Sequence, residues 1–193
     1  MIDPFDEKVG LKLPKLEADI LLVTHEHFDH NNIKAVSGNP FLITGPGEYE
    51  IKGVYVQGIS AFHDKSQGKD RGTITLYTIE AEDGLRLCHL ADLGQPELTE
   101  EQLDLIGDID VLMIPVGGVY TISSQEVSKI ISQIEPKIVI PMHYSIPKLT
   151  VQLDGVEKFL KVMGAKETES QPKLSIKKKD LTEEETKVVV LEP

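Results

Sequence analysis

The chain has 193 residues, one cysteine and a formal net charge of −12 at pH 7, and these values exclude several classes of protein. The length suits one domain, so residues 1–193 are expected to form a single unit. Cys88 alone excludes an intrachain disulfide and fits a cytoplasmic protein. The chain has no basic leader and no apolar run near the roughly 20 residues of a membrane span, so no membrane association is expected. Nucleic-acid binders usually carry a basic face, so the acidic charge favours a small-molecule substrate.

Strands separated by turns are expected in the first half of the chain. Asp83-Gly84 is a hairpin signal that pairs the strand before it with the strand after it. Gly45-Pro46-Gly47-Glu48 is interpreted as a connecting turn, and a helix is expected after Asn31-Asn32. Five segments have the apolar or alternating pattern of strands: Asp19–Val23, Phe41–Thr44, Gly53–Gly58, Thr73–Glu82 and Leu85–Leu90.

Helices and strands alternate in the second half. Thr99-Glu100-Glu101-Gln102 is a capping box, which predicts a helix to Ile106. Ser123 opens a second helix that runs to about Ile134 and is ended by Pro136, and Asp154–Gly164 is a third. Strands are expected at Asp110–Pro115, Lys137–Pro141 and Val188–Leu191, and Lys177-Lys178-Lys179 is interpreted as a solvated strand end. The alternation predicts a layered α/β protein.

The placement of the histidines is the most informative feature of the sequence. Three of the six fall in the segment His25-Glu26-His27-Phe28-Asp29-His30, which follows the predicted strand Asp19–Val23. Ligand crevices in open α/β sheets form at such carboxyl ends of strands. In an extended stretch, residues i and i+2 point the same way, so His25 and His27 are expected to hold one metal ion. Asp29 and His30 come where the chain turns and can face a second ion. Imidazole and carboxylate ligands suit zinc, and two ions about 3.5–4 Å apart can share a bridging hydroxide.

Further candidate ligands follow other predicted strands. His63 lies in Ala-Phe-His-Asp and His143 in Pro-Met-His-Tyr, and each is interpreted as a ligand because the His25–His30 cluster is present. Asp92 follows the strand Leu85–Leu90 and fits a bridging carboxylate.

The order of these residues resembles a known pattern. His25-x-His27-x-Asp29-His30 followed by His63, Asp92 and His143 is similar to the metallo-β-lactamase superfamily. The closest likeness is to its small zinc-dependent hydrolases, in the branch of the ascorbate-phosphate lactonase-like proteins. The likeness runs from Ile2 to about Tyr144. The strings that support this branch are Ile2-Asp3-Pro4-Phe5, Gly45-Pro46-Gly47-Glu48-Tyr49, His89-Leu90-Ala91-Asp92-Leu93-Gly94, Ile114-Pro115-Val116-Gly117-Gly118 and Pro141-Met142-His143-Tyr144.

The resemblance implies a four-layer αββα sandwich with two divalent metal ions at one edge between its sheets. It also implies that Asp92 bridges the two ions and that Asp3 organises the ligand loop. The implied ligands are His25, His27 and His63 for the first ion, and Asp29, His30 and His143 for the second. Zinc is the expected metal, with manganese or iron as alternatives.

Two departures from the family pattern bear on these expectations. No segment of residues 1–193 matches the family's usual N-terminal β-hairpin, so an N-terminally shortened fold is expected. Such a fold is expected to expose a sheet edge, which favours a homo-oligomer. The second departure is Ala91, which stands where the family string has glycine and where a methyl group can tilt Asp92.

The expected function is a dinuclear metal-dependent hydrolase that uses a metal-bridged hydroxide on a small lactone, ester or phosphoester. Asp29 is expected to accept the proton of the water, while His89 or Tyr144 donates to the developing oxyanion or leaving group. Packing is the other interpretation of His89 and Tyr144. Gly117-Gly118 is either a close approach to a ligand or a flexible turn.

Three other functions are compatible with the same ligand pattern. The main alternative is a non-catalytic metal-binding or regulatory protein that retains the ligand shell. A nuclease of the same superfamily is disfavoured by the net charge of −12. A flavodiiron-like redox role would require iron and an electron donor.

Overall fold

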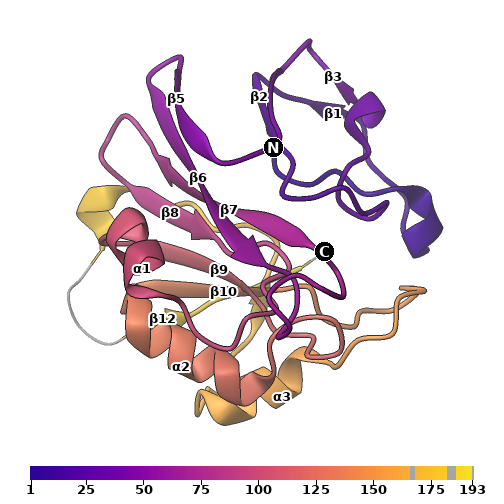
Figure 1. Ribbon diagram of the computed structural model, residues 1–193, viewed down its shortest axis with the longest axis vertical. Helices are drawn as coiled ribbons and strands as arrows, with labels where there is room; N and C mark the ends of the chain where they lie inside the picture. The colour runs from indigo at the N-terminus through magenta and orange to yellow at the C-terminus, as the bar shows by residue number, and fades with distance from the viewer. Residues whose placement is uncertain (166–167, 182–185, 193) are drawn as a thin grey trace.

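The computed structural model describes residues 1–165, 168–181 and 186–192. A seven-stranded mixed sheet forms the centre of the molecule (Figure 1). In spatial order its strands are β12 (Lys187–Val188), β10 (Ile138–Met142), β9 (Val111–Pro115), β8 (Arg86–His89), β7 (Thr73–Glu80), β6 (Val54–Phe62) and β5 (Gly47–Ile51).

The sheet has an antiparallel half and a parallel half. β5, β6, β7 and β8 form an antiparallel meander. The turn between β7 and β8 contains Gly84 at φ 78°, as the Asp83-Gly84 signal predicts. β8, β9, β10 and β12 are parallel to one another. The carboxyl ends of β8, β9 and β10 therefore meet at the same edge of the sheet.

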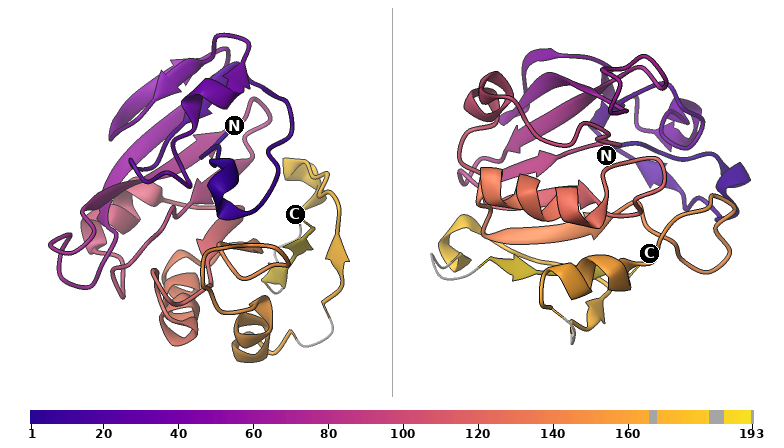
Figure 2. Two further views of the ribbon diagram at one scale, coloured as in Figure 1. Left: turned by 90° about the vertical axis from the view of Figure 1, so that its right-hand side faces the viewer. Right: turned by 60° about the horizontal axis from the view of Figure 1, so that its bottom comes forward.

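Three α-helices cover one face of this sheet: α1 (Glu100–Ile106), α2 (Ser124–Ile134) and α3 (Val156–Val162). The predicted capping boxes of Thr99 with Gln102 and of Ser123 with Glu126 are both formed. α2 presents an apolar stripe to the sheet, and α2 and α3 lie side by side below β9 and β10 (Figures 1 and 2). Leu112 and Ile114 of β9 are fully buried beneath these helices. Among the described residues, no helix is long and apolar enough to cross a membrane.

Small sheets and irregular chain cover the opposite face. The pair β2 (Ile20–Leu22) and β4 (Phe41–Ile43) packs on β6 and β7, where Tyr77 is fully buried and its hydroxyl donates to the carbonyl of Val23. Further strand pairs are β1 (Leu16–Glu17) with β3 (Val36–Ser37), and β11 (Ser170–Gln171) with β13 (Val190–Leu191). The 3-10 helices are η1 (Glu7–Val9), η2 (Ile33–Ala35) and η3 (Lys178–Asp180).

Several predicted elements differ in the structure. The turn expected at residues 45–48 instead leads into β5, which begins at Gly47. The helix expected after Asn32 is only the single turn η2, and the strand end expected at residues 177–179 is η3. The strand expected at residues 188–191 divides into β12 and β13, which belong to different sheets. The chain changes sheets at Val189, where the buried side chain packs with Ile138 and Ile140 on one face while Val190 packs on the other.

Asp110 connects the start of β9 to two lysines from distant segments. Its carboxylate is 4% exposed, lies 2.6 Å from Lys178 Nζ and 3.6 Å from Lys137 Nζ, and accepts a hydrogen bond from the Arg86 backbone N–H. Burial raises the pKa of Asp110, but the hydrogen bonds and the two ammonium groups outweigh it and hold the pKa below its usual value.

Asp110→Asn is expected to lower the free energy of unfolding at pH 7 by about 2 kcal/mol, because a buried charge-assisted hydrogen bond is lost. Because the pKa of Asp110 is lower in the folded than in the unfolded state, the ionised carboxylate stabilises the fold above about pH 3.8. This stabilisation is lost as the pH falls through the folded-state pKa of Asp110. Urea unfolding of both proteins between pH 7 and pH 2.5 should therefore show a difference that shrinks only in acid. A difference independent of pH would contradict the role assigned to the ionised carboxylate.

Candidate metal centre

The His25–His30 segment lies directly after β2, at the edge where the carboxyl ends of β8 and β10 also arrive. The segment is not extended as expected. It bends at His25 and Glu26 and then forms a turn in which the His30 N–H donates to the carbonyl of His27 over 2.9 Å. The bend still brings the rings of His25 and His27 to 4.6 Å. The turn, rather than strand alternation, therefore gathers the side chains.

The structure brings His25, His27 and His63 into one group whose nitrogen atoms lie within 4.8 Å of one another. His63 Nε2 is 3.3 Å from His27 Nδ1. His25 Nε2 is buried and has no hydrogen-bond partner among the residues that the structure describes. Ligand atoms about 2.0–2.1 Å from one tetrahedral zinc lie about 3.3 Å apart, so these nitrogens have the spacing of a metal site.

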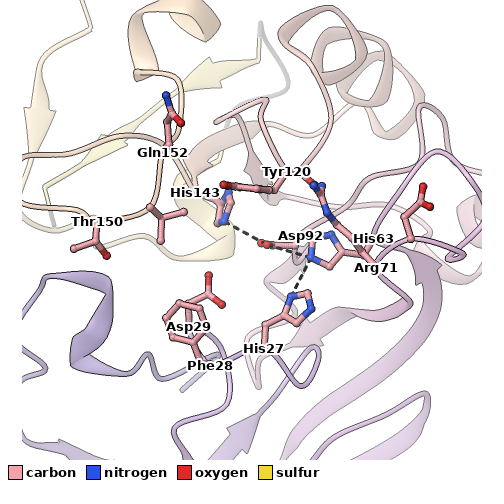
Figure 3. Close-up of a pocket in the computed structure, with 12 residues that line it drawn as sticks. His27, Phe28, Asp29, His63, Arg71, Asp92, Tyr120, His143, Thr150 and Gln152 are labelled. Atoms are coloured by element: carbon pink, nitrogen blue, oxygen red, sulfur yellow. Dashed lines mark hydrogen bonds and ion pairs between the residues drawn. The ribbon is translucent and has the colours of Figure 1, made fainter.

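A second group contains Asp29, His30 and His143, and Asp92 lies between the two groups. Asp29 Oδ2 is 3.6 Å from His30 Nε2. Asp92 Oδ2 lies 3.5 Å from His30 Nε2. The same oxygen lies 3.7 Å from His63 Nε2 and 3.3 Å from His143 Nε2 (Figure 3). All seven candidate ligands therefore meet in one cluster, with one oxygen of Asp92 close to both groups.

A buried hydrogen-bond network fixes the proton positions on two of the imidazoles. Asp3 Oδ2 accepts from Thr24 Oγ1 over 2.7 Å and from His30 Nδ1 over 3.0 Å, while Asp3 Oδ1 accepts from the Thr24 N–H. Because the Thr24 hydroxyl gives its proton to Asp3, it must accept from His25 Nδ1, which is 2.8 Å away. In neutral His25 and His30 the Nε2 atoms are then unprotonated, as metal ligands require.

Thr24→Val should weaken metal binding by about 10- to 100-fold, the usual effect of removing a partner that orients a ligand. The variant keeps the volume of the buried side chain but lets His25 rotate and change tautomer. Zinc competition titrations with a fluorescent chelator measure the affinity. Thr24→Ser keeps the hydroxyl and should retain most of the wild-type affinity. Equal weakening in both variants would show that the hydroxyl group of Thr24 is not the cause of the effect.

Burial and the neighbouring carboxylates determine which side chains of the cluster are charged. Burial and the neighbouring His30 lower the pKa of His25 to about 3, so this imidazole is neutral. Burial also opposes charge on His30, but hydrogen bonds to Asp3 and Asp92 raise its pKa to about 10. Burial similarly opposes ionisation of Asp92, yet His143 and His30 hold its pKa well below the usual range. His30 must therefore release a proton when it binds a metal ion.

Two glycines allow the ligand segments to approach each other. A Cβ on Gly94 would lie 2.3 Å from the carbonyl carbon and oxygen of His63, and a Cβ on Gly117 would lie 2.2 Å from the carbonyl oxygen of His143. Gly117 therefore packs against the backbone of His143, a contact that neither interpretation of Gly117-Gly118 from the sequence included. Ala91 has φ 49°, a left-handed conformation that glycine adopts without strain. Its methyl group leaves Asp92 within the cluster.

The two residues expected to donate protons lie around this cluster. His89 Nδ1 accepts from the Ala91 N–H over 3.1 Å, which supports the turn that presents Asp92. The hydroxyl of Tyr144 donates to the carbonyl of Leu191 over 3.3 Å, so its proton is already engaged by the backbone. Both contacts favour the packing interpretation over proton donation.

Two of the cavities beside the cluster contain residues of its second ligand group. One, of about 570 Å³, exposes Asp29, His63, Asp92 and His143, and it also contains Arg71 and Tyr120, which sequence analysis did not select (Figure 3). Their only signal in the sequence was their position in loops that follow candidate ligands or strand ends. The other cavity, of about 430 Å³, is mostly apolar and shares Asp29 and His143 with the first.

Comparison with known proteins agrees with the fold and the cluster. The model of the beta-lactamase superfamily domain matches residues 1–143. A UPF0173 metal-dependent hydrolase of Thermococcus onnurineus (strain NA1) is 31% identical over 194 residues, which cover 86% of this chain and 85% of the relative.

Comparison with solved structures also finds similarity to metallo-β-lactamase-like proteins. A crystal structure from Thermotoga maritima, of a protein proposed to be a Zn-dependent hydrolase of the metallo-β-lactamase superfamily, is 35% identical with a TM-score of 0.76. The match covers 98% of this chain and 87% of that one. A protein of Parabacteroides distasonis ATCC 8503 has the same fold at 21% identity, with a TM-score of 0.59 over 84% of this chain and 78% of its own.

These matches confirm the predicted α/β fold, with its mixed central sheet and three helices. In the described residues those helices all lie on one face, and the outer layer of the other face contains only 3-10 helices. The chain belongs to the metallo-β-lactamase superfamily, within its UPF0173 family of metal-dependent hydrolases.

Proposed function

We propose that this protein is a dinuclear hydrolase that cleaves a small lactone, ester or phosphoester. The observation that supports the proposal best is the position of Asp92 Oδ2, which lies 3.3–3.7 Å from one imidazole of the first ligand group and two of the second. A single carboxylate oxygen in this position suits a bridge between two ions.

The residues of the cluster fit zinc by the chemistry of their donor atoms. The first group offers three imidazole nitrogens, and the second offers two imidazoles and a carboxylate. His25 Nε2 is buried and has no hydrogen-bond partner in the described part of the chain, which is a costly arrangement unless a cation satisfies this nitrogen. Manganese and iron also accept such ligands, so the donor set does not separate them from zinc.

Bound divalent ions would lower the pKa of a water molecule and polarise a substrate oxygen. The protein's own residues would then place the substrate and handle the proton. Asp29 is partly exposed and lies where the two cavities meet, so its carboxylate is placed to accept a proton from an attacking water. The hydroxyl of Tyr144 donates to the carbonyl of Leu191, which counts against Tyr144 as the proton donor to a leaving group.

Elemental analysis of the purified chain, before and after incubation with zinc, manganese or iron(II), tests the dinuclear proposal. About two ions per chain are expected, together with turnover of at least one member of a panel of neutral and anionic esters, lactones and phosphodiesters. One ion per chain would reject the dinuclear site. Two ions without turnover of any of these classes would reject them as substrates and favour a metal-binding role.

A further inference from the structure

Arg71 lies in the loop that follows β6, and this loop is built around one buried carboxylate. Asp64 is 8% exposed and accepts four backbone hydrogen bonds from the loop. The donors are the N–H groups of Ser66 at 2.7 Å, Gly68 at 2.9 Å, Asp70 at 3.1 Å and Arg71 at 2.8 Å. The backbone of Arg71 is therefore held in place next to the candidate ligand His63.

The side chain of Arg71 is held from a second direction. Its Nη1 donates to the carbonyl of Tyr120 over 2.8 Å, and its Cζ lies 4.9 Å from the centre of the Tyr120 ring. Both residues line the cavity that exposes the cluster, and Figure 3 shows Arg71 beside His63 and Tyr120. Because a guanidinium group has five N–H donors and this contact uses one, donors remain for a ligand.

The charges around Arg71 distinguish it from the other arginine of the chain. Arg86 pairs with the carboxylate of Glu80 at 3.7 Å. Within residues 1–165, 168–181 and 186–192, Arg71 forms no ion pair with a carboxylate, and no lysine lines the cavity of about 570 Å³ that exposes the cluster. In a chain with a net charge of −12, this places one unpaired guanidinium beside the cluster.

We propose that Arg71 binds an anionic group of the substrate, a carboxylate or a phosphate, away from the bond that is cleaved. The inference rests on the proposed hydrolase function and narrows its substrates to those that carry a negative charge. A guanidinium group binds a carboxylate or phosphate through paired hydrogen bonds. It also offsets the repulsion that an acidic protein exerts on an anion. Tyr120 is the platform that keeps the guanidinium in position.

Matched esters separate recognition by Arg71 from a general structural role. The mono(4-nitrophenyl) esters of adipate and suberate carry a terminal carboxylate, while 4-nitrophenyl hexanoate and octanoate have the same lengths without it. For Arg71→Gln with zinc bound, KM is expected to rise about tenfold for the two anionic esters and to stay unchanged for the neutral ones. The control is Lys69→Gln, which removes the same charge from an exposed position in the same loop outside the cavity. Equal changes for anionic and neutral esters, or none, would overturn the inference.

A measurement of binding alone tests the anion site at Arg71 independently of the proposed hydrolase activity. Calorimetry with monomethyl adipate and monomethyl suberate should show about tenfold weaker binding to zinc-loaded Arg71→Gln than to the wild type or Lys69→Gln. If the wild type hydrolyses none of the four nitrophenyl esters but shows this Arg71-dependent binding, the ester-hydrolase function fails and the anion site stands. If the wild type binds neither probe, or the variant binds both as the wild type does, the anion site is wrong.

Discussion

Asp92→Asn should abolish the dinuclear site and lower kcat/KM at least about 100-fold, because even partners that only orient metal ligands contribute 10- to 100-fold. The amide removes the negative charge that lies within 3.3–3.7 Å of three imidazoles. Elemental analysis should show fewer than two ions per chain, and turnover of a substrate identified with the wild-type protein gives the rate.

The matched control is Asp108→Asn, which removes the same charge from an exposed position between α1 and β9. This variant should keep the metal content and the rate of the wild type. His143→Ala should lose metal in the same way as Asp92→Asn, since His143 Nε2 belongs to the second group. Full occupancy in both cluster variants would show that neither residue is needed to hold a metal ion.

Gly94→Ala is expected to lower the free energy of unfolding by about 3 kcal/mol, at the upper end of the usual cost of overpacking. The added Cβ would lie 2.3 Å from the carbonyl of His63 and 2.4 Å from the Asp64 nitrogen, which are backbone atoms that no rotamer change can move. The loop that carries Asp92 must then move away from His63. Metal content should therefore fall together with stability, and urea unfolding and elemental analysis measure the two effects.

Gly45→Ala is the control for this substitution. A Cβ at Gly45 would meet no atom within 4 Å, and Gly45 does not have a positive φ. The variant should unfold within about 0.5 kcal/mol of the wild type, as surface substitutions usually do. A Gly94→Ala protein as stable as Gly45→Ala would mean that the two ligand loops adapt to each other more readily than the close backbone contact indicates.

Local signals in the sequence were sufficient for most of the fold. The capping boxes at Thr99 and Ser123 specify the start of α1 and α2, because side chain and backbone satisfy each other within four residues. Gly58 misled the interpretation, since it was expected to end a strand that continues to Phe62. A Cβ there would lie 2.6 Å from the carbonyl of Gly45, so the glycine serves a contact between segments that sequence patterns do not show.

The candidate site, like the fold, was predictable from the sequence only in part. The chemistry of the seven cluster residues was visible in their types and order, and the structure brings all seven together. The support by Thr24 was not visible, because a threonine beside a histidine has no distinctive pattern. Arg71 and Tyr120 were missed for a different reason. They meet only because Asp64 shapes one loop and β9 positions another, which is a tertiary arrangement.

The pairing of β12 with β10 has a consequence for synthesis on the ribosome. β10 ends at Met142, directly before His143. On one side, its residues Ile138 and Val139 pair with Lys187 and Val188, which are synthesised much later. Until those residues emerge, β10 is an edge strand with apolar side chains on both faces, a form prone to pair with other chains. The cluster residues are thus all synthesised before the sheet beside them can close. We expect nascent chains that stop before residue 187 to be recognised by chaperones rather than to load metal.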